Sequence, residues 1–205
     1  HESFSWGELV PFYPWVGFLI GLFLAAGAFL MNRASPGSPL LSGASLLALW
    51  AGITGALHLD GWMDCADSLF VPLPPARRLE IMSDPHVGAF GVVGLVVLLL
   101  IKFSGLTQMM VLLVGRGTTW DLVTALIPFV LVPLIGRMAC VIVLLDSEIP
   151  CARPEGMGAR VRQGLSPKWA LISLALGAGL TFTGLWRGLA MVLIGLAIGW
   201  SFARW

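Results

Sequence analysis

The sequence predicts an all-α, polytopic integral membrane protein with about six transmembrane helices and two long cytoplasmic loops. Hydrophobic residues make up 58% of the 205 residues and charged residues only 11%, whereas soluble domains usually carry about 25% charged residues. Several apolar runs exceed the ~18 uncharged residues that are typical of a membrane-spanning helix. These runs do not alternate between apolar and polar residues, so they are expected to be helices rather than barrel strands.

Six apolar segments are expected to cross the bilayer within a single membrane domain, residues 1–205. The first ends at a turn-forming SPGSP sequence, and the second runs directly into His58. Lys102 interrupts the third, and the fourth contains Pro128 and Pro133, which predict a kink or a break. The expected spans are residues 15–31, 39–57, 88–114, 120–145, 169–186 and 189–202.

Two long polar intervals, residues 58–87 and 146–167, lie on one face of the membrane if there are six spans. Within the first interval, PARRLEIMSD is typical of a short interfacial helix. Seven basic residues lie on this face or at its edge and three lie opposite: Arg77, Arg78, Arg153, Arg160, Arg162, Lys168 and Arg204 against Arg33, Arg116 and Arg187. This bias predicts that both loops are cytoplasmic. All acidic residues except Asp121 fall on the same face.

The overall composition excludes some classes of partner and site. A net charge of +1 gives no argument for binding nucleic acid. The three cysteines lack CxxC spacing, so a disulfide framework or a thiolate metal site is not expected. The chain begins with His1, so we expect it to be a fragment of a longer product. The pairs Gly17–Gly21 and Gly177–Gly184 permit close helix packing and leave a homo-oligomer open.

An acidic cluster, HLDGWMDCADSLF at residues 58–70, follows the second apolar run directly. If this stretch is helical, Asp60, Asp64 and Asp67 share one face within about 60°. Like charges on one stripe repel one another, and Mg²⁺, which binds oxygen ligands, would remove that penalty. The simpler alternative is a solvated loop. The apolar neighbours of the aspartates favour a metal or phosphate role, because ionisable groups at membrane depth are usually functional.

A second polar stripe is expected in the following segment, where Arg77, Glu80 and Asp84 would share a helix face. His58 projects roughly 160° from Asp60 on a continuous helix, so its pattern favours neither a helix-end residue nor a catalytic one.

Three further basic residues are candidate anion ligands. Arg153 lies in ARPEGMGAR, whose guanidinium and glycines suit a phosphate, although a positive-inside loop with turn glycines is the simpler explanation. Arg137 and Lys102 lie at membrane depth, where they either reach toward an interface or pair with an anionic site.

Taken together, these motifs resemble the cobalamin synthase family, the adenosylcobinamide-GDP ribazoletransferases. The resemblance is carried by GALHLDGWMDCADS at 55–68, LEIMSDPHVGAFG at 79–91, GR at 136–137 and ARPEGMGA at 152–159. PWVGFLIG at 14–21 and LLLIKF at 98–103 match further shared stretches. Each motif alone is weak, but their order and spacing together are specific.

The resemblance implies a multi-pass enzyme of a prokaryotic inner membrane that performs the last assembly step of adenosylcobalamin. With Mg²⁺, it would transfer the adenosylcobinamide phosphoryl group from adenosylcobinamide-GDP to α-ribazole or its 5′-phosphate and release GMP. Asp60, Asp64 and Asp67 would then hold Mg²⁺ at the diphosphate. Asp84, Glu80 or His58 would position or deprotonate the attacking hydroxyl, and the substrate-binding residues would be Arg137, Arg153, Lys102 and Arg77.

The chain departs from the family pattern in a few places. Ser68 replaces a closing glycine, and His86, preceded by Pro85, replaces a basic residue. The family also begins earlier and continues through a G-G-x-T-G-D motif, so further site residues are expected outside this chain.

Two other functions remain alternatives. CDP-alcohol phosphotransferases share an aspartate-rich motif, but theirs has an A-R pair at a place where this sequence has none, and the spacing of its aspartates differs. A divalent-cation transporter would place acidic residues near the bilayer midplane of several helices.

Overall fold

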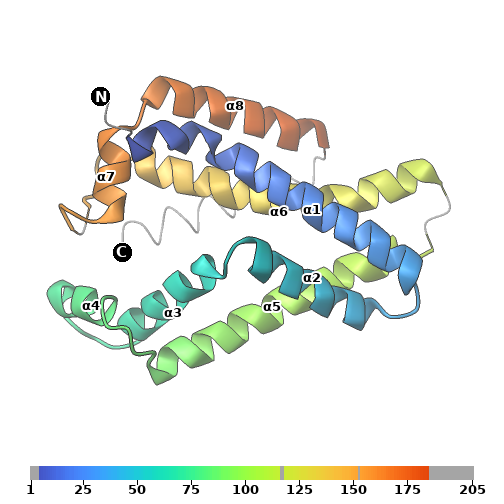
Figure 1. Ribbon diagram of the computed structural model, residues 1–205, viewed down its shortest axis with the longest axis horizontal. Coiled ribbons are helices and arrows are strands. Elements are labelled where there is room, and N and C mark those ends of the chain that lie inside the picture. The colour runs from blue at the N-terminus through green and yellow to red at the C-terminus, as the bar shows by residue number, and fades with distance from the viewer. Residues whose placement is uncertain (1–4, 116–117, 152, 185–205) are drawn as a thin grey trace. The chain divides into compact units, whose positions relative to one another are not determined.

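The computed structural model describes residues 5–115, 118–151 and 153–184, and every regular element in these ranges is a helix (Figure 1). The prediction of an all-α fold is therefore confirmed for the described residues. The helices are η1 (Trp6–Phe12), α1 (Tyr13–Ala34), α2 (Pro39–Ile53), α3 (Leu57–Leu69), α4 (Pro75–Ile81), α5 (Ala89–Leu113), α6 (Thr119–Leu145), α7 (Met157–Gln163) and α8 (Pro167–Gly184).

Three stretches of the described chain are long and apolar enough to cross a membrane: Trp6–Ala34, Ala89–Leu113 and Asp121–Leu145. The pair α2 and α3 adds a fourth if the two helices form one bent span. The chain is thus a membrane protein with three or four candidate spans, and six spans are not shown. Helix α8 covers the described part of the expected fifth span, and the expected sixth, residues 189–202, lies outside the described residues.

Exposed apolar side chains along α5 fit contact with lipid, because the helix carries a continuous apolar surface that no other described element covers. The exposed large side chains of its first half are Phe90, Val92, Val93, Val96, Val97, Leu100 and Ile101.

The chain divides into two compact units, residues 1–26 with 123–205 and residues 27–122. Each is described by itself, and the single membrane domain stays a prediction. In the unit of residues 27–122, α5 packs along both α2 and α3 (Figure 1). Gly43 of α2 permits one of these contacts, because a Cβ there would lie 2.3 Å from the Thr107 hydroxyl oxygen of α5.

A sharp bend separates α2 from α3. Helix α2 ends at Ile53, so the expectation that it continues to residue 57 is wrong. Gly55 and Ala56 adopt left-handed backbone angles, with φ of 60° and 57°, and α3 then leaves at 91° to α2. The left-handed conformation costs a residue other than glycine about 1–2 kcal/mol. Ala56 is therefore a strained joint.

In the unit of residues 1–26 and 123–205, α1 lies close against α6. A Cβ on Gly17 would lie 2.5 Å from the Pro133 carbonyl oxygen, and one on Gly21 would lie 2.5 Å from the Val130 Cα. The Gly17–Gly21 pair is thus used for packing within this chain. Pro128 and Pro133 lie inside a continuous helix of 27 residues, so the helix is not broken there, and a kink stays a prediction. Membrane helices tolerate proline where their neighbours satisfy the freed backbone groups.

The core of this unit also fixes the second long polar interval. Val10 of η1, Val141 of α6, Val161 of α7 and Ala170 of α8 form one buried cluster. Helix α7, which the sequence did not predict, is therefore anchored to the apolar helices by its own valine.

Candidate functional site

The acidic cluster is helical, which is the condition under which its three aspartates share one face. Helix α3 carries Asp60, Asp64 and Asp67; Asp60 is exposed and the other two are half-buried. The negative charges of Asp60 and Asp67 both repel the negative charge of Asp64. Three carboxylates therefore share one stretch of helix without a basic residue of that helix to balance them.

Asp67 differs from the other two because its carboxylate joins α3 to α5. One carboxylate oxygen accepts the backbone N–H of Gly88 at 2.8 Å, and the other accepts that of Gly91 at 2.7 Å. The first N–H groups of a helix have no partner within the helix, and a negative charge there is favoured by the helix dipole. Asp67 thus acts as an N-terminal cap for α5, supplied by a different helix.

Glycines on α5 make this contact possible. A Cβ at Gly88 or at Gly91 would lie 2.3 Å from a carboxylate oxygen of Asp67. One turn further along α5, a Cβ at Gly94 would lie 2.8 Å from the Ala66 Cβ. Gly88, Gly91 and Gly94 therefore allow α3 to pack against α5, a role that the sequence pattern did not reveal.

His58 and Lys102, expected as a catalytic and a substrate-binding residue, contact each other. The Lys102 ammonium nitrogen lies 2.9 Å from His58 Nε2 and 4.1 Å from the centroid of the Trp50 ring. His58 Nδ1 lies 3.2 Å from the Thr54 hydroxyl oxygen. These contacts link α2, α3 and α5 at the bend.

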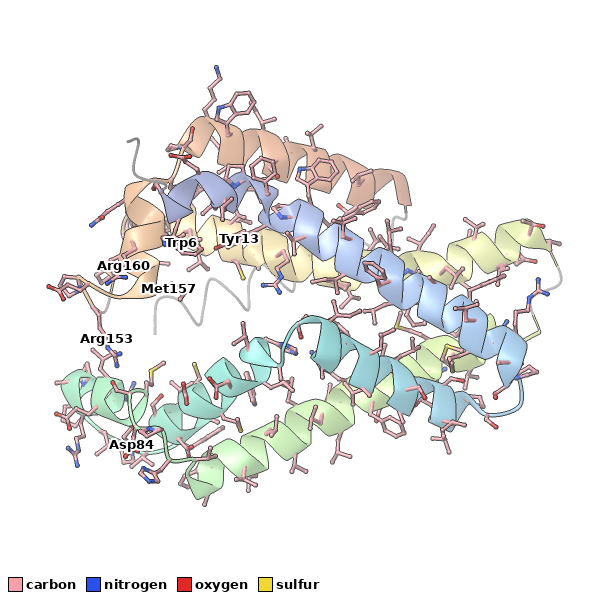
Figure 2. The ribbon with its side chains drawn as sticks, viewed as in Figure 1. Trp6, Tyr13, Asp84, Arg153, Met157 and Arg160 are labelled. Atoms are coloured by element: carbon pink, nitrogen blue, oxygen red, sulfur yellow. The ribbon has the colours of Figure 1, made fainter. Side chains whose placement is uncertain are left out.

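The segment around α4 holds the other expected acids. Arg77 and Glu80 form an exposed ion pair on α4. The helix ends at Ile81, so the prediction that Asp84 shares their helix face is wrong. Asp84 instead lies in the turn between α4 and α5, as Figure 2 shows.

Asp84 pairs with His86, the residue that departs from the family pattern. The carboxylate accepts the His86 backbone N–H at 2.9 Å and lies 2.6 Å from His86 Nδ1. These two hydrogen bonds, the backbone one first, lower the pKa of the exposed Asp84 carboxyl. Asp84 is thus held in its ionised form.

Two of the three arginines expected to bind substrate, Arg137 and Arg153, lie in the other unit. Arg137 is half-buried on α6, where a Cβ at Gly17 would lie 2.9 Å from its Cγ. Arg153 is exposed in the segment that precedes α7 (Figure 2). Its carbonyl oxygen accepts the backbone N–H of Gly156 at 3.1 Å, which turns the chain into α7.

The sequence did not single out Arg162, which fixes the end of α6. Its guanidinium donates to the carbonyl oxygens of Val143 at 3.3 Å, of Asp146 at 2.9 Å and of Ile149. The last carbonyl groups of a helix have no partner within the helix. Arg162 thus satisfies carbonyls at and after the end of α6 and holds α7 beside them.

The second departure from the family pattern, Ser68, is accommodated locally. Ser68 is buried, and its hydroxyl donates to the Cys65 carbonyl oxygen at 3.0 Å. A buried hydroxyl carries little cost once it is hydrogen-bonded, so the serine leaves α3 intact.

The described residues include no group of three or more His, Cys, Asp and Glu side chains placed to hold a metal ion. Mg²⁺ is commonly bound by one or two carboxylates and completes its shell with water and substrate phosphates. Asp60 and Asp64, which lie one helical turn apart and whose negative charges repel each other, fit that smaller demand. The metal role of all three aspartates stays a prediction.

This fold defines a class of protein: an all-helical membrane protein in which a candidate membrane span packs against an acidic helix. Within that class, a family model described as Cobalamin-5-phosphate synthase matches residues 1–205, so the chain belongs to this family. The resemblance carried by the sequence motifs is thereby confirmed.

Similar proteins carry one shared name, Adenosylcobinamide-GDP ribazoletransferase. The chain is 42% identical to one from Stutzerimonas stutzeri over 83% of this chain and 63% of the relative. It is 34% identical to one from Deinococcus radiodurans over 94% and 64%, and 38% identical to one from Pseudomonas aeruginosa over 98% and 76%. The chain thus spans less than two thirds of the first two relatives. No solved structure matches it.

Proposed function

We propose that this protein is an adenosylcobinamide-GDP ribazoletransferase that performs the final assembly step of adenosylcobalamin. The observation that carries the proposal is the family match over all 205 residues. In this reaction the 3′-hydroxyl of α-ribazole, or of its 5′-phosphate, attacks the phosphorus bound to cobinamide. The bond from that phosphorus to the oxygen of GMP breaks, GMP leaves, and the hydroxyl proton passes to a base.

Mg²⁺ is the cofactor that the acidic helix would hold, with Asp60 and Asp64 as its principal ligands. Their chemistry supports this, because phosphoryl transfer depends mainly on positioning and charge neutralisation. Both oxygens of Asp67 already accept backbone N–H groups. A carboxylate can accept about four hydrogen bonds, so Asp67 can still contribute an oxygen while it caps α5. When bound, Mg²⁺ would neutralise charge on the diphosphate.

Among the candidate bases, we favour Asp84. It is ionised and exposed, and both of its hydrogen bonds with His86 involve Oδ1, so Oδ2 can take the proton of the attacking hydroxyl. Glu80 is paired with the permanently charged Arg77, and both ring nitrogens of His58 have partners. We assign Arg137 and Arg153 to the non-bridging phosphate oxygens, where guanidinium groups bind bidentately.

We further propose that the protein lies in the inner membrane of a prokaryote with α3, α4 and α7 on the cytoplasmic side. The candidate spans and the excess of basic residues around these helices support that placement. The nucleotide substrate would then be reached from the cytoplasm.

The test is release of GMP by the full chain in liposomes. Turnover should require adenosylcobinamide-GDP, α-ribazole and Mg²⁺ together. Asp60→Asn and Asp64→Asn should each lower it by at least tenfold, which is about 1.4 kcal/mol of lost transition-state stabilisation. Asp121→Asn, at the start of α6, is the matched control and should leave turnover unchanged. GMP release without α-ribazole would contradict the proposal, and cation flux without turnover would favour a transporter.

A further inference from the structure

We infer that Lys102 is a positioning residue that, through His58, holds the bend from which α3 presents Asp60 and Asp64. Its link to Mg²⁺ rests on the proposed function. The geometric part, that Lys102 sets the angle between α2 and α3, does not. The sequence left Lys102 either reaching toward an interface or pairing with an anionic site, and we expected it to bind substrate; its observed partners lead to this different role.

Lys102 contacts both arms of the bend from a third helix. Its ammonium lies 2.9 Å from His58 Nε2 on α3 and 4.1 Å from the Trp50 ring centroid on α2. A lysine over the face of a tryptophan ring is attracted by the ring electrons. Lys102 is half-buried, so both interactions are formed partly away from water. One side chain of α5 thus joins the end of α2 to the start of α3.

The hydrogen-bond chain has only one consistent direction. A lysine ammonium can only donate, so His58 Nε2 accepts and the proton of the neutral imidazole lies on Nδ1. Nδ1 then donates to the Thr54 hydroxyl oxygen, 3.2 Å away. The Thr54 hydroxyl donates in turn to the Trp50 carbonyl oxygen at 2.9 Å. The chain therefore runs from α5 through the first turn of α3 to the last turn of α2.

The bend requires such a support because its backbone is strained. Ala56 has a φ of 57°, which an L-amino acid other than glycine rarely adopts. Strained conformations persist only where surrounding contacts hold them. Helix α5 holds α3 through Asp67 and α2 through Gly43, and Lys102 lies between these two contacts at the joint itself.

The position of His58 links the bend to the acidic stripe. Asp60 follows His58 by two residues in the first turn of α3, so a shift of His58 turns Asp60 with it. Groups that orient metal ligands typically affect metal affinity or activity by 10- to 100-fold, without touching the substrate. We therefore expect substitution of Lys102 to change the affinity for Mg²⁺ and not the contacts with the substrate.

The geometric part is tested by spin labels on the two arms of the bend. The labels are attached to cysteines that replace Leu41 on α2 and Gly61 on α3, both exposed positions. The protein's own three cysteines are replaced by serine. Lys102→Met should broaden or shift the distance distribution between the labels, and Lys102→Arg, which keeps a donor, should restore it. An unchanged distribution in Lys102→Met would overturn the positioning role.

The link to Mg²⁺ is tested by kinetics on the same variants without labels. Lys102→Met should raise the Mg²⁺ concentration for half-maximal turnover by about tenfold or more, with substrate KM unchanged at saturating Mg²⁺. His58→Phe should have the same effect, and the double variant should be no worse than either. Additive effects, or a raised KM for adenosylcobinamide-GDP with normal Mg²⁺ dependence, would overturn the inference.

The two experiments also separate this inference from the proposed function. If the wild-type protein released no GMP, the proposed function would fail, while a changed label distance in Lys102→Met would still support the role of Lys102 at the bend.

Discussion

The Asp67 carboxylate accepts the backbone N–H of Gly91 at 2.7 Å, and this contact joins the acidic helix α3 to the first turn of α5. Its second oxygen accepts the N–H of Gly88. One of the three aspartates on the stripe therefore has a structural role that can be measured apart from any metal. The three carboxylates should not respond alike to substitution.

Asp67→Asn should destabilise the protein, whereas Asp60→Asn should not. The asparagine amide donates hydrogen bonds, so one side of it would face a backbone N–H instead of accepting it. Loss of a hydrogen bond to a charged group costs about 1.5–3 kcal/mol. Thermal unfolding in detergent, followed by tryptophan fluorescence, measures the difference. Equal midpoints for the two variants would contradict the capping role.

Gly91→Ala should destabilise the same contact from the α5 side. A Cβ there would lie 2.3 Å from an Asp67 oxygen and 3.1 Å from the Met63 carbonyl oxygen, and overpacking of this kind costs about 1–3 kcal/mol. Gly61→Ala is the matched control, because a Cβ at Gly61 meets nothing within 4 Å. It should stabilise α3 by about 0.5–1 kcal/mol. Denaturation midpoints that moved in the same direction would disprove this reading of the interface.

The sequence predicted those features that depend on nearby residues. Continuous apolar runs located α5 and α6 to within a few residues, because burial in lipid requires a long uncharged helix. The four- and three-residue spacing of Asp60, Asp64 and Asp67 predicted that they share one face if their segment is helical, and it is, since helical periodicity is also local.

Features that depend on contacts between helices were not predictable in this way. The pairing of Asp67 with α5 and of His58 with Lys102 joins residues 24 and 44 positions apart. The bend at Gly55 and Ala56 interrupts an apolar run that gave no sign of it, because neither residue is a strong helix breaker in a membrane. Asp84 was placed on a helix that stops three residues earlier.

Gly17→Ala should loosen the packing of α1 on α6. A Cβ at Gly17 would lie 2.5 Å from the Pro133 carbonyl oxygen, so the helices would have to separate at a cost of about 1–3 kcal/mol. Gly179→Ala on α8, where nothing lies within 4 Å, is the control. Heat-induced aggregation in detergent should begin at a lower temperature only in Gly17→Ala. No difference between the two would show that α1 and α6 are not in close contact.

His86→Ala should move the acidic limb of the activity profile to higher pH, if Asp84 is the base. His86 lowers the pKa of Asp84 through its backbone N–H and its ring. Removing the ring leaves the backbone contribution, so the pKa rises only part of the way to its ordinary value. A carboxylate with a higher pKa is protonated at a higher pH, and the base is lost earlier as the pH falls. GMP release measured from pH 3 to 7 at saturating Mg²⁺ gives the limb, and an unmoved limb would exclude Asp84 as the base.

Arg162→Ala should release the segment between α6 and α7. The guanidinium donates to the carbonyl oxygens of Val143, Asp146 and Ile149, and carbonyls left without a partner cost about 1–3 kcal/mol. The segment should then open locally and become a site of proteolysis, because cleavage requires a backbone freed from its contacts. Arg160→Ala, an exposed position on α7 (Figure 2), is the control for the loss of one positive charge. Faster cleavage between residues 146 and 156 in Arg162→Ala alone supports the role, and equal cleavage in both variants would show that charge, not carbonyl binding, holds the segment.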